Sequence, residues 1–223
     1  KGKRMDFQEA RRNMIESQVR TWEVLDDRVL AALDRVPRHE FVPADSREWA
    51  YIDYQIPLGI GEYMLSPLVE ARLVQELRLN SGDKVLEVGT GSGYVTALLA
   101  QLAAEVWSVE VTPGFKVEAE QRLGDMGYDN VRVEVGDGSH GWERQGPYDA
   151  ILVTGALPYL PDAFKEQLKP GGRLVAIVDQ ESPVQEAFRL TRMGEDAFRE
   201  ESLFELEGVP HLRGVEKKKE FVF

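Results

Sequence analysis

The sequence predicts an α/β fold: a mostly parallel sheet with an antiparallel edge strand, plus an N-terminal helical extension. Three observations predict it. From residue 84 onward apolar strands alternate with helical segments, three closely spaced glycines follow the first strand, and the last segments alternate apolar and polar residues. Strands that alternate with helices need right-handed crossovers, and these give a parallel sheet covered on both faces.

The first part of the chain predicts helices and a long loop. An interrupted amphipathic stripe predicts helix over 6–33, and Val36-Pro37-Arg38 breaks the pattern. Segment 39–64 is predicted as loop because it carries the residues Pro43, Pro57, Gly59 and Gly61. Ser66 followed by Pro67 is typical of an N-cap with proline in the first helical turn, which predicts a helix from there to about residue 77.

The remaining elements follow the alternation. Strands are predicted at 84–88, 105–110, 131–135, 149–153 and 173–178, with helices at 94–102, 113–126 and around 161–168. Segments 184–191 and 198–206 alternate apolar and polar residues and predict an antiparallel hairpin at the sheet edge. The chain is therefore divided into an extension at 1–78 that packs on the core, a core at 79–212 and a tail at 213–223.

Composition restricts the class of protein. The net charge of −12, from 39 acidic against 27 basic residues, repels polyanions and disfavours a nucleic-acid partner. No apolar run reaches the roughly 20 residues that a membrane helix needs, so no membrane partner is expected. The chain has no cysteine and no compact cluster of metal ligands, so no metal site is predicted. We expect a cytoplasmic protein.

The glycine-rich turn is the most informative motif. Glu87, Gly89, Gly91 and Gly93 follow one another at intervals of two residues at the end of an apolar strand. Glycine permits backbone conformations closed to other residues and lets a ligand approach the main chain. The apolar run that follows predicts a helix whose free N–H groups face the same place. The dinucleotide-binding fingerprint needs glycine where this chain has Tyr94, so a nicotinamide or flavin site is the weaker interpretation.

Acidic residues stand at the ends of the next two strands. Glu110 lies about 20 residues after the glycine turn, where a carboxylate can accept both hydroxyls of a ribose. Asp137 lies between Gly136 and Gly138 after the third strand, where it can turn toward the same cleft. Carboxyl ends of parallel strands meet at one edge of a sheet, so these side chains are expected to lie together.

The motif resembles motif I of the class I S-adenosylmethionine-dependent methyltransferases, and the predicted sheet matches their Rossmann-like fold. The resemblance implies S-adenosyl-L-methionine as cofactor and S-adenosyl-L-homocysteine as product. Glu87 would serve the methionine end of the cofactor, Asp137 the adenine, and Thr154 would face the transferring methyl group. Further backbone and hydroxyl contacts would come from Gly89, Thr90, Gly91, Ser92 and Gly93, with Gly138 beside the adenine.

Over residues 13–212 the chain resembles the protein-L-isoaspartate (D-aspartate) O-methyltransferases. The most specific matching stretches are Val36-Pro37-Arg38 and Pro57-Leu58-Gly59; broader ones are Gly136-Asp137-Gly138 with Gly141-Trp142, and 167–175. The resemblance implies methylation of the free carboxylate of isoaspartyl residues in damaged proteins, and so a protein or peptide substrate. A carboxylate with a reference pKa near 4 is already ionised at neutral pH, so this chemistry needs no catalytic base.

One segment departs from the family pattern. Where the family reads Gly-Gln-Thr-Ile-Ser-Gln-Pro, this chain reads Gly61-Glu62-Tyr63-Met64-Leu65-Ser66-Pro67. Tyr63 and Leu65 stand at the two hydroxyl positions that the family holds beside the acceptor, and leucine cannot donate a hydrogen bond. Ser66 would substitute only if the loop shifted by one position. Gly155 replaces an alanine after Thr154 and is expected to widen the acceptor pocket.

Three functions follow. The leading one is an isoaspartyl methyltransferase with a modified acceptor loop, in which Tyr63, Leu65, Ser66 and Thr154 surround the acceptor. The second is a relative that methylates another protein acceptor or an unidentified small molecule. The third is a protein that binds S-adenosylmethionine without turnover. The three histidines, His39, His140 and His211, are expected to have structural or surface roles.

Overall fold

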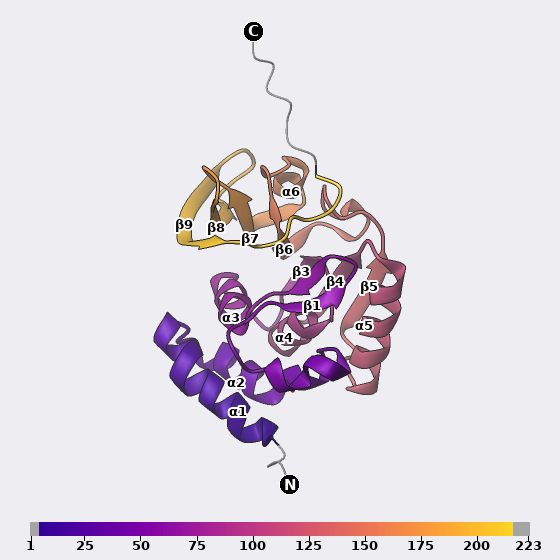
Figure 1. The fold of residues 1–223 in the computed structure, drawn as a ribbon. Coiled ribbons are helices and arrows are strands. Elements are labelled where there is room, and N and C mark those ends of the chain that lie inside the picture. Colours follow the sequence, from indigo (N-terminus) through magenta and orange to yellow (C-terminus); the bar gives the residue numbers. More distant parts are fainter. Residues whose placement is uncertain (1–4, 216–223) are drawn as a thin grey trace.

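The computed structural model describes residues 5–215. Its centre is a seven-stranded sheet in the order β5-β4-β3-β6-β7-β8-β9, drawn in Figure 1. The first five strands in that order are parallel, whereas β8 pairs antiparallel with β7 and β9 antiparallel with β8. Their bounds are β3 Lys84–Val88, β4 Glu105–Glu110, β5 Val131–Val135, β6 Tyr148–Leu157, β7 Leu168–Asp179, β8 Val184–Arg192 and β9 Phe198–Glu207. The predicted α/β class and antiparallel edge are confirmed.

Helices cover both faces of this sheet. Successive residues of β3 enter different cores: Val85 belongs to the core shared with the N-terminal helices, and Leu86 to the core that contains Phe164. The first core includes α4 (Tyr94–Leu102), which is buried along almost its whole length, and part of α5 (Pro113–Asp125). The second includes the short α6 (Ala163–Glu166). Both faces being covered explains why β3 is buried along almost its whole length.

Strands β6 and β7 are longer than predicted. β6 continues past residue 153 because the β6–β7 register shifts between Leu152 and Ala156 instead of ending the strand. Pro170-Gly171-Gly172, which precedes the predicted strand at 173–178, lies inside β7 as an irregularity: pairing passes from Tyr148 with Leu168 to Ala150 with Arg173. Local sequence patterns did not indicate the strand pairing that continues beyond these irregularities.

The N-terminal extension is helical but is not one helix. α1 (Phe7–Met14) passes into a π-helical turn (Ile15–Val19) and a 3₁₀ turn (Arg20–Trp22), and α2 (Asp27–Arg35) follows. Glu23 ends the first run because its backbone is left-handed, with φ of 64°. α3 (Pro67–Glu76) begins where Ser66 and Pro67 predicted, although the Ser66 side chain makes no capping hydrogen bond.

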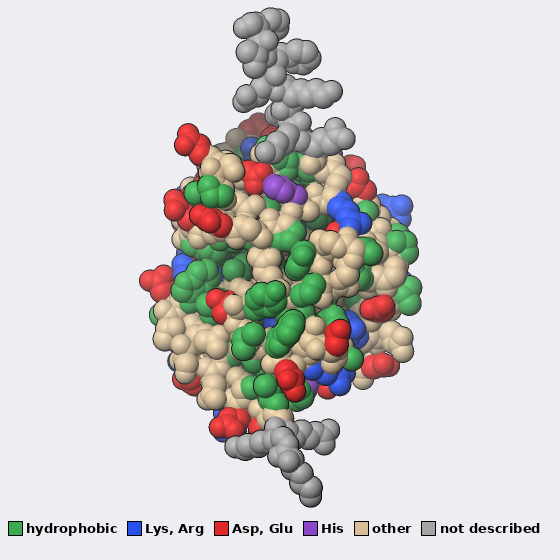
Figure 2. All heavy atoms as spheres, viewed as in Figure 1, with side chains coloured by type: hydrophobic (Ala, Val, Ile, Leu, Met, Phe, Trp, Pro, Cys, Tyr) green, Lys and Arg blue, Asp and Glu red, His purple; other side chains and the backbone are tan. Residues whose placement is uncertain are grey.

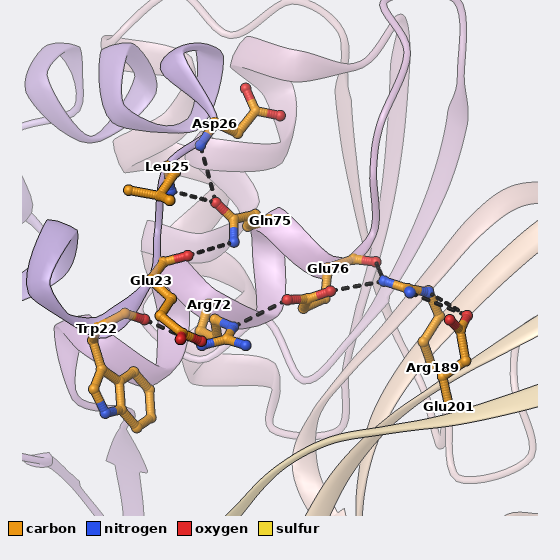
Figure 3. A network of polar contacts seen from close by, with 9 residues as sticks. All are labelled: Trp22, Glu23, Leu25, Asp26, Arg72, Gln75, Glu76, Arg189 and Glu201. Carbon is orange, nitrogen blue, oxygen red and sulfur yellow. Dashed lines mark hydrogen bonds and ion pairs between the residues drawn. The ribbon is translucent and has the colours of Figure 1, made fainter.

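Polar contacts from α3 join the extension to the far edge of the sheet (Figure 3). Gln75 accepts hydrogen bonds from the N–H groups of Leu25 and Asp26, at 2.7 and 3.0 Å. Glu76 pairs with Arg189 of β8 at 2.7 Å, and Arg189 also pairs with Glu201 of β9. The extension therefore packs on the core through α3.

The segment predicted as loop contains a small hairpin, β1 (Ile56–Gly59) and β2 (Glu62–Met64). Its turn places Gly59, Ile60 and Gly61 at positive φ, which explains the two glycines. Strands this short, one of them containing proline, give no alternation long enough to predict. In Figure 1 the hairpin crosses in front of the sheet, over β3 and β4. None of the described helices is long and apolar enough to cross a membrane.

Candidate active site

The loop after β3 is held in one conformation by its glycines and by Thr154. Gly89, Gly91 and Gly93 all have positive φ, at 98°, 52° and 86°. A Cβ on Gly89 would lie 2.4 Å from Thr154 Oγ1, so a side chain there is excluded. Thr154 Oγ1 lies 2.9 Å from the carbonyl oxygen of Val88 and 2.7 Å from that of Gly89. The end of β6 thus supports the loop that leaves β3.

Glu110, at the end of β4, holds the same loop from the other side. Its buried carboxylate accepts hydrogen bonds from Gly91 N (2.9 Å) and Thr112 N (2.8 Å). The predicted strand-end position is therefore beside the glycine loop. Its oxygens lie next to an open cleft, where ribose hydroxyls can compete for or share these contacts.

Glu87 lies fully buried beneath the loop. Its Oε2 accepts hydrogen bonds from Thr96 at 2.5 Å and from Ser108 at 2.6 Å, while Oε1 has no partner among the described residues. Burial raises its pKa to about 8, against the opposing effect of the two hydroxyl donors. Glu87 is not among the described residues that line the cleft beside the loop. Thr90 joins this network through a 2.6 Å bond to Ser108.

The remaining predicted cofactor residues lie either in the glycine loop or just after β5. Ser92 is buried in the loop, and its Oγ lies 3.3 Å from the N–H of Tyr94. Gly93 supports packing, since a Cβ there would lie 3.2 Å from Ala119 of α5. Gly138 borders the cleft, whereas Asp137 turns its carboxylate onto Ser139 N at 2.9 Å. The hydrogen bonds from Ser139 lower the pKa of Asp137.

Arg38 positions the segment that follows the hairpin. Its fully buried guanidinium pairs with Glu70 of α3 at 3.0 Å and donates to the carbonyl oxygens of Ala50 and Leu65, each at 2.6 Å. Burial raises the pKa of Glu70 to about 7, opposed by Arg38. The Val36-Pro37-Arg38 motif therefore fixes the backbone of Leu65, one of the two altered acceptor positions.

The two altered positions do face the glycine loop. Tyr63 and Leu65 line the cleft together with Thr154 and Gly89. Tyr63 is 45% exposed, whereas Leu65 is 5% exposed. Ser66 is not in this cleft; it borders a separate groove on the other side of Tyr63. In this position the Ser66 hydroxyl does not line the cleft beside Tyr63 and Leu65.

A segment after β9 completes the site, and the sequence did not reveal it. Ala156 N donates to Pro210 O at 2.9 Å, and Leu212 N donates to Ala156 O at 2.8 Å. A Cβ on Gly155 would lie 2.9 Å from Leu212 N. The expectation that Gly155 widens the pocket is wrong, because its space admits the backbone of Leu212.

The same segment reaches the hairpin through Arg213. Its Nε lies 2.6 Å from Glu62 Oε1, and it also donates to Ile60 O at 2.9 Å. The residue predicted to start a tail therefore joins the C-terminal segment to β1–β2 across the cleft mouth. His211 lines the cleft, and its Nε2 is hydrogen-bonded to Asp179 at 2.7 Å.

Together these elements enclose a cleft of about 670 Å³ including its open mouth. A smaller cavity of about 330 Å³ adjoins it, with Thr90, Ser92 and Glu70 in its wall. Residues from the strand ends, the hairpin and the C-terminal segment border the cleft: Val88, Gly89, Gly91, Glu110, Gly138, Thr154, Tyr63, Leu65, Leu212 and Arg213. The glycine backbone and the Glu110 carboxylate give this cleft a polar wall, and Val88, Leu65 and Leu212 give it an apolar one.

The sheet, the glycine loop and the acidic strand ends define a class I S-adenosylmethionine-dependent methyltransferase. The model of the protein-L-isoaspartate (D-aspartate) O-methyltransferase family matches residues 9–215. The chain belongs to this family, whose members methylate protein substrates that contain isoaspartate.

Relatives and solved structures agree with this assignment. Protein-L-isoaspartate O-methyltransferase 2 of a Polaromonas species is 48% identical over 162 residues, 73% of this chain and 77% of that protein. Protein-L-isoaspartate O-methyltransferase 1 of Rhodopseudomonas palustris is 42% identical over 92% of this chain and 83% of its own length. A solved protein-L-isoaspartate O-methyltransferase superposes with a TM-score of 0.78 at 26% identity; the match covers 90% of this chain and 65% of that one.

Proposed function

We propose that this chain transfers the methyl group of S-adenosylmethionine to the free carboxylate of L-isoaspartyl residues in damaged proteins. One observation carries the proposal: a single cleft brings the glycine loop and Glu110 together with Tyr63, Leu65 and Thr154. The cofactor supplies a methyl group on a positively charged sulfur and leaves as S-adenosylhomocysteine. We assign its binding to Glu87, Glu110 and Asp137, to the loop residues Gly89, Thr90, Gly91, Ser92 and Gly93, and to Gly138.

The chain's own residues have two tasks in this reaction. The first is to hold an acceptor oxygen in line with the methyl group, at roughly 3 Å, which accounts for much of the rate acceleration in such transfers. The hairpin and the Pro210–Arg213 segment, joined by the Arg213–Glu62 pair, form the wall on the acceptor side. The second is to exclude water from the reacting atoms, for which buried Leu65 is well suited.

The acceptor carboxylate needs no proton transfer, because it is ionised at neutral pH. The Thr154 hydroxyl donates its hydrogen to the carbonyl oxygens of Val88 and Gly89, so it is not free to donate to the acceptor. Its role toward the acceptor is therefore to shape the cleft. Tyr63 is the residue of the altered loop that carries a hydroxyl and lines the cleft. The proposal includes a cytoplasmic location, and the net charge of −12 supports an acceptor other than nucleic acid.

Two alternatives are favoured by the same altered loop. Without the family's threonine and serine hydroxyls, the cleft can accept another protein group or a small molecule, or it can bind S-adenosylmethionine without turnover.

The test is transfer of tritiated methyl from S-adenosylmethionine to an isoaspartyl peptide, to its normal aspartyl counterpart and to a cell extract. The proposal predicts that the isoaspartyl peptide acquires a base-labile tritiated methyl group and that the normal aspartyl peptide does not.

Label only in the extract would support another acceptor. Binding of S-adenosylhomocysteine by calorimetry, without label in any sample, would support the non-catalytic alternative. Either result would contradict the isoaspartyl proposal and leave the family assignment unchanged.

A further inference from the structure

Strand β5 forms one edge of the seven-stranded sheet, and in Figure 1 it lies at the outside of the sheet beside α5. The carbonyl oxygen of Asn130, just before β5, and the N–H of Gly136, just after it, both bond to β4 at 2.9 Å. Backbone groups of successive strand residues point to opposite sides, so the even-numbered residues bond to β4. The N–H and C=O groups that point away from the sheet therefore belong to Val131, Val133 and Val135.

A groove runs along this outer side of β5. It has a volume of about 790 Å³ including its open side, and residues on both faces of the sheet line it. Trp107 packs on the core that contains Phe164, whereas Leu123 and Val131 belong to the core shared with the N-terminal helices. Gly124 of α5 also lines the groove, and nothing lies within 4 Å of its Cβ position. The groove therefore reaches around the edge, and the backbone of β5 is open to another strand.

The sequence of β5 is complementary to itself. It reads Val131-Arg132-Val133-Glu134-Val135, with opposite charges on the two sides of a central valine. When two copies of β5 lie antiparallel with Val133 beside Val133, Arg132 of each copy faces Glu134 of the other. The outward backbone groups then form the hydrogen-bonded pairs, and the charged residues form the non-hydrogen-bonded pairs, in which side chains lie closer. Opposite charges in such pairs stabilise a sheet.

Both charged side chains keep atoms available for a second copy. Arg132 is exposed and donates through Nη1 to the carbonyl oxygens of Asp129 and Val131, at 2.9 and 2.8 Å, while Nε and Nη2 have no partner among the described residues. Glu134 Oε2 accepts a hydrogen bond from Trp142 Nε1 at 2.6 Å, while Oε1 has no partner in the described part of the chain. An Arg132–Glu134 pair between copies therefore breaks no contact within one copy.

β9, at the opposite edge of the sheet, lacks this complementarity. It contains one arginine and four glutamates: Arg199, Glu200, Glu201, Glu205 and Glu207. Acidic side chains are also scattered over the face drawn in Figure 2, in keeping with the net charge of −12. Two copies of the chain therefore repel one another in general, and β5 is the edge at which opposite charges meet.

We propose that β5 binds β5 of a second copy of this chain, so that the two sheets join edge to edge about a two-fold axis at Val133. The pairing satisfies the outward backbone groups of both strands and forms two Arg132–Glu134 pairs. A strand of another sequence can use the same backbone groups, but the arrangement of both charges matches β5 itself. This inference goes beyond the proposed function and does not depend on methyl transfer.

Sedimentation equilibrium of the intact chain over about 10–500 µM tests the association, which depends on concentration. The wild-type protein is expected to approach the mass of two chains. Arg132→Glu puts an acidic side chain opposite Glu134 at two places and should raise the dissociation constant about 30-fold. The double variant, Arg132→Glu with Glu134→Arg, restores opposite charges and should return the constant to within about threefold of wild type.

Arg199→Glu is the matched control, because it makes the same change of net charge at an exposed position on β9. It should leave the dissociation constant within about twofold of wild type, since a charge far from the interface is screened by salt. Thermal unfolding checks that each variant is folded. Arg132→Glu keeps the bond between Trp142 and Glu134, so the single variant stays informative if the double variant does not fold.

Amide hydrogen exchange distinguishes strand pairing from other contacts between copies. In the wild-type dimer the outward N–H groups of Val131, Val133 and Val135 should exchange at least ~10-fold more slowly than in monomeric Arg132→Glu.

A wild-type protein with the mass of one chain at every concentration would overturn the inference. Equal dissociation constants for the wild type and Arg132→Glu would do the same, as would a folded double variant that stays monomeric. A dimer whose three valine amides exchange as fast as those of the monomer would show that the copies meet at another surface. The proposed function is tested separately, because none of these measurements involves a methyl acceptor.

Discussion

The two halves of the cleft are built in different ways. The half that we assign to the cofactor comes from one stretch of chain, Glu87 to Gly138, whose assigned residues lie at or after the carboxyl ends of strands of the parallel sheet. The acceptor half combines the hairpin, the end of β6 and Pro210–Arg213, which are far apart in sequence. The first half depends on local backbone geometry, and the second on contacts such as those of Arg38 and Arg213.

The largest effect is expected from breaking the buried support of the acceptor half. Arg38→Met removes the pair with Glu70 and leaves the carbonyl oxygens of Ala50 and Leu65 without their donor, and should lower the free energy of unfolding by about 3–5 kcal/mol. Denaturant unfolding measures it. Arg47→Met is the control, because its pair with Glu40 is exposed and should contribute about 1 kcal/mol or less. Equal losses in the two variants would argue against a supporting role for Arg38.

The cofactor half is tested by Gly91→Val. Gly91 has φ of 52°, and its N–H donates to Glu110, so a branched side chain there strains the loop and projects into the cleft. Affinity for S-adenosylhomocysteine should fall at least ~100-fold while the fold is retained. Gly127→Val is the control, since Gly127 also has positive φ but nothing lies within 4 Å of its Cβ position. Undiminished binding by the Gly91 variant in calorimetry would show that the nucleoside binds elsewhere.

The difference between the halves also explains what could be predicted from the sequence. Strand ends, the glycine loop, Glu87 and Glu110 follow from patterns that span a few residues, and the structure places them at one edge of the sheet. The hairpin was missed because its strands are three and four residues long. Arg213 and Leu212 were assigned to a tail or to the core boundary, because only the folded chain brings them to Gly155 and Glu62.

Tyr63 and Leu65, the two altered positions that the resemblance indicated, line the cleft, but the resemblance could not show what fills the space around them. Ser66 lies in the neighbouring groove and Gly155 admits backbone, and both facts depend on packing between distant segments. The position of Asp137 after the strand could be predicted, but its rotamer could not, because the hydrogen bond from the Ser139 N–H determines it.

Glu87 gives a pH test of the cofactor half. Its pKa is raised to about 8 in the folded protein, so the folded state retains a proton that the unfolded chain loses above its ordinary value. Stability should therefore fall as the pH rises from about 4.5 to about 8. Glu87→Gln keeps the side chain neutral and should remove most of that fall, measured as unfolding free energy at pH 5 and pH 8.5.

Glu195→Gln, on the exposed turn between β8 and β9, is the control and should leave the pH dependence of the wild-type protein unchanged. A Glu87→Gln variant with the wild-type pH dependence would mean that Glu87 stays ionised when buried.

The smallest expected effect concerns the altered loop. Leu65→Ser restores a hydroxyl at a position whose backbone Arg38 holds in place, and should raise kcat/KM for an isoaspartyl peptide about 5–10-fold, in line with one added hydrogen bond. Leu65→Ala opens the same space without a donor and should give no gain. If serine also gives none in the methyl-ester assay, the loop serves another acceptor.

The account depends on donor and acceptor meeting in the one cleft between the strand ends and the hairpin. A crystal structure of the protein with S-adenosylhomocysteine and an isoaspartyl peptide tests this most directly. We expect the nucleoside beside Glu110, the sulfur near Thr154, and a carboxylate oxygen of the peptide beside Leu65, positioned so that a methyl group on the sulfur would lie about 3 Å away. A nucleoside bound outside this cleft, or a peptide carboxylate on the far side of the hairpin, would contradict it.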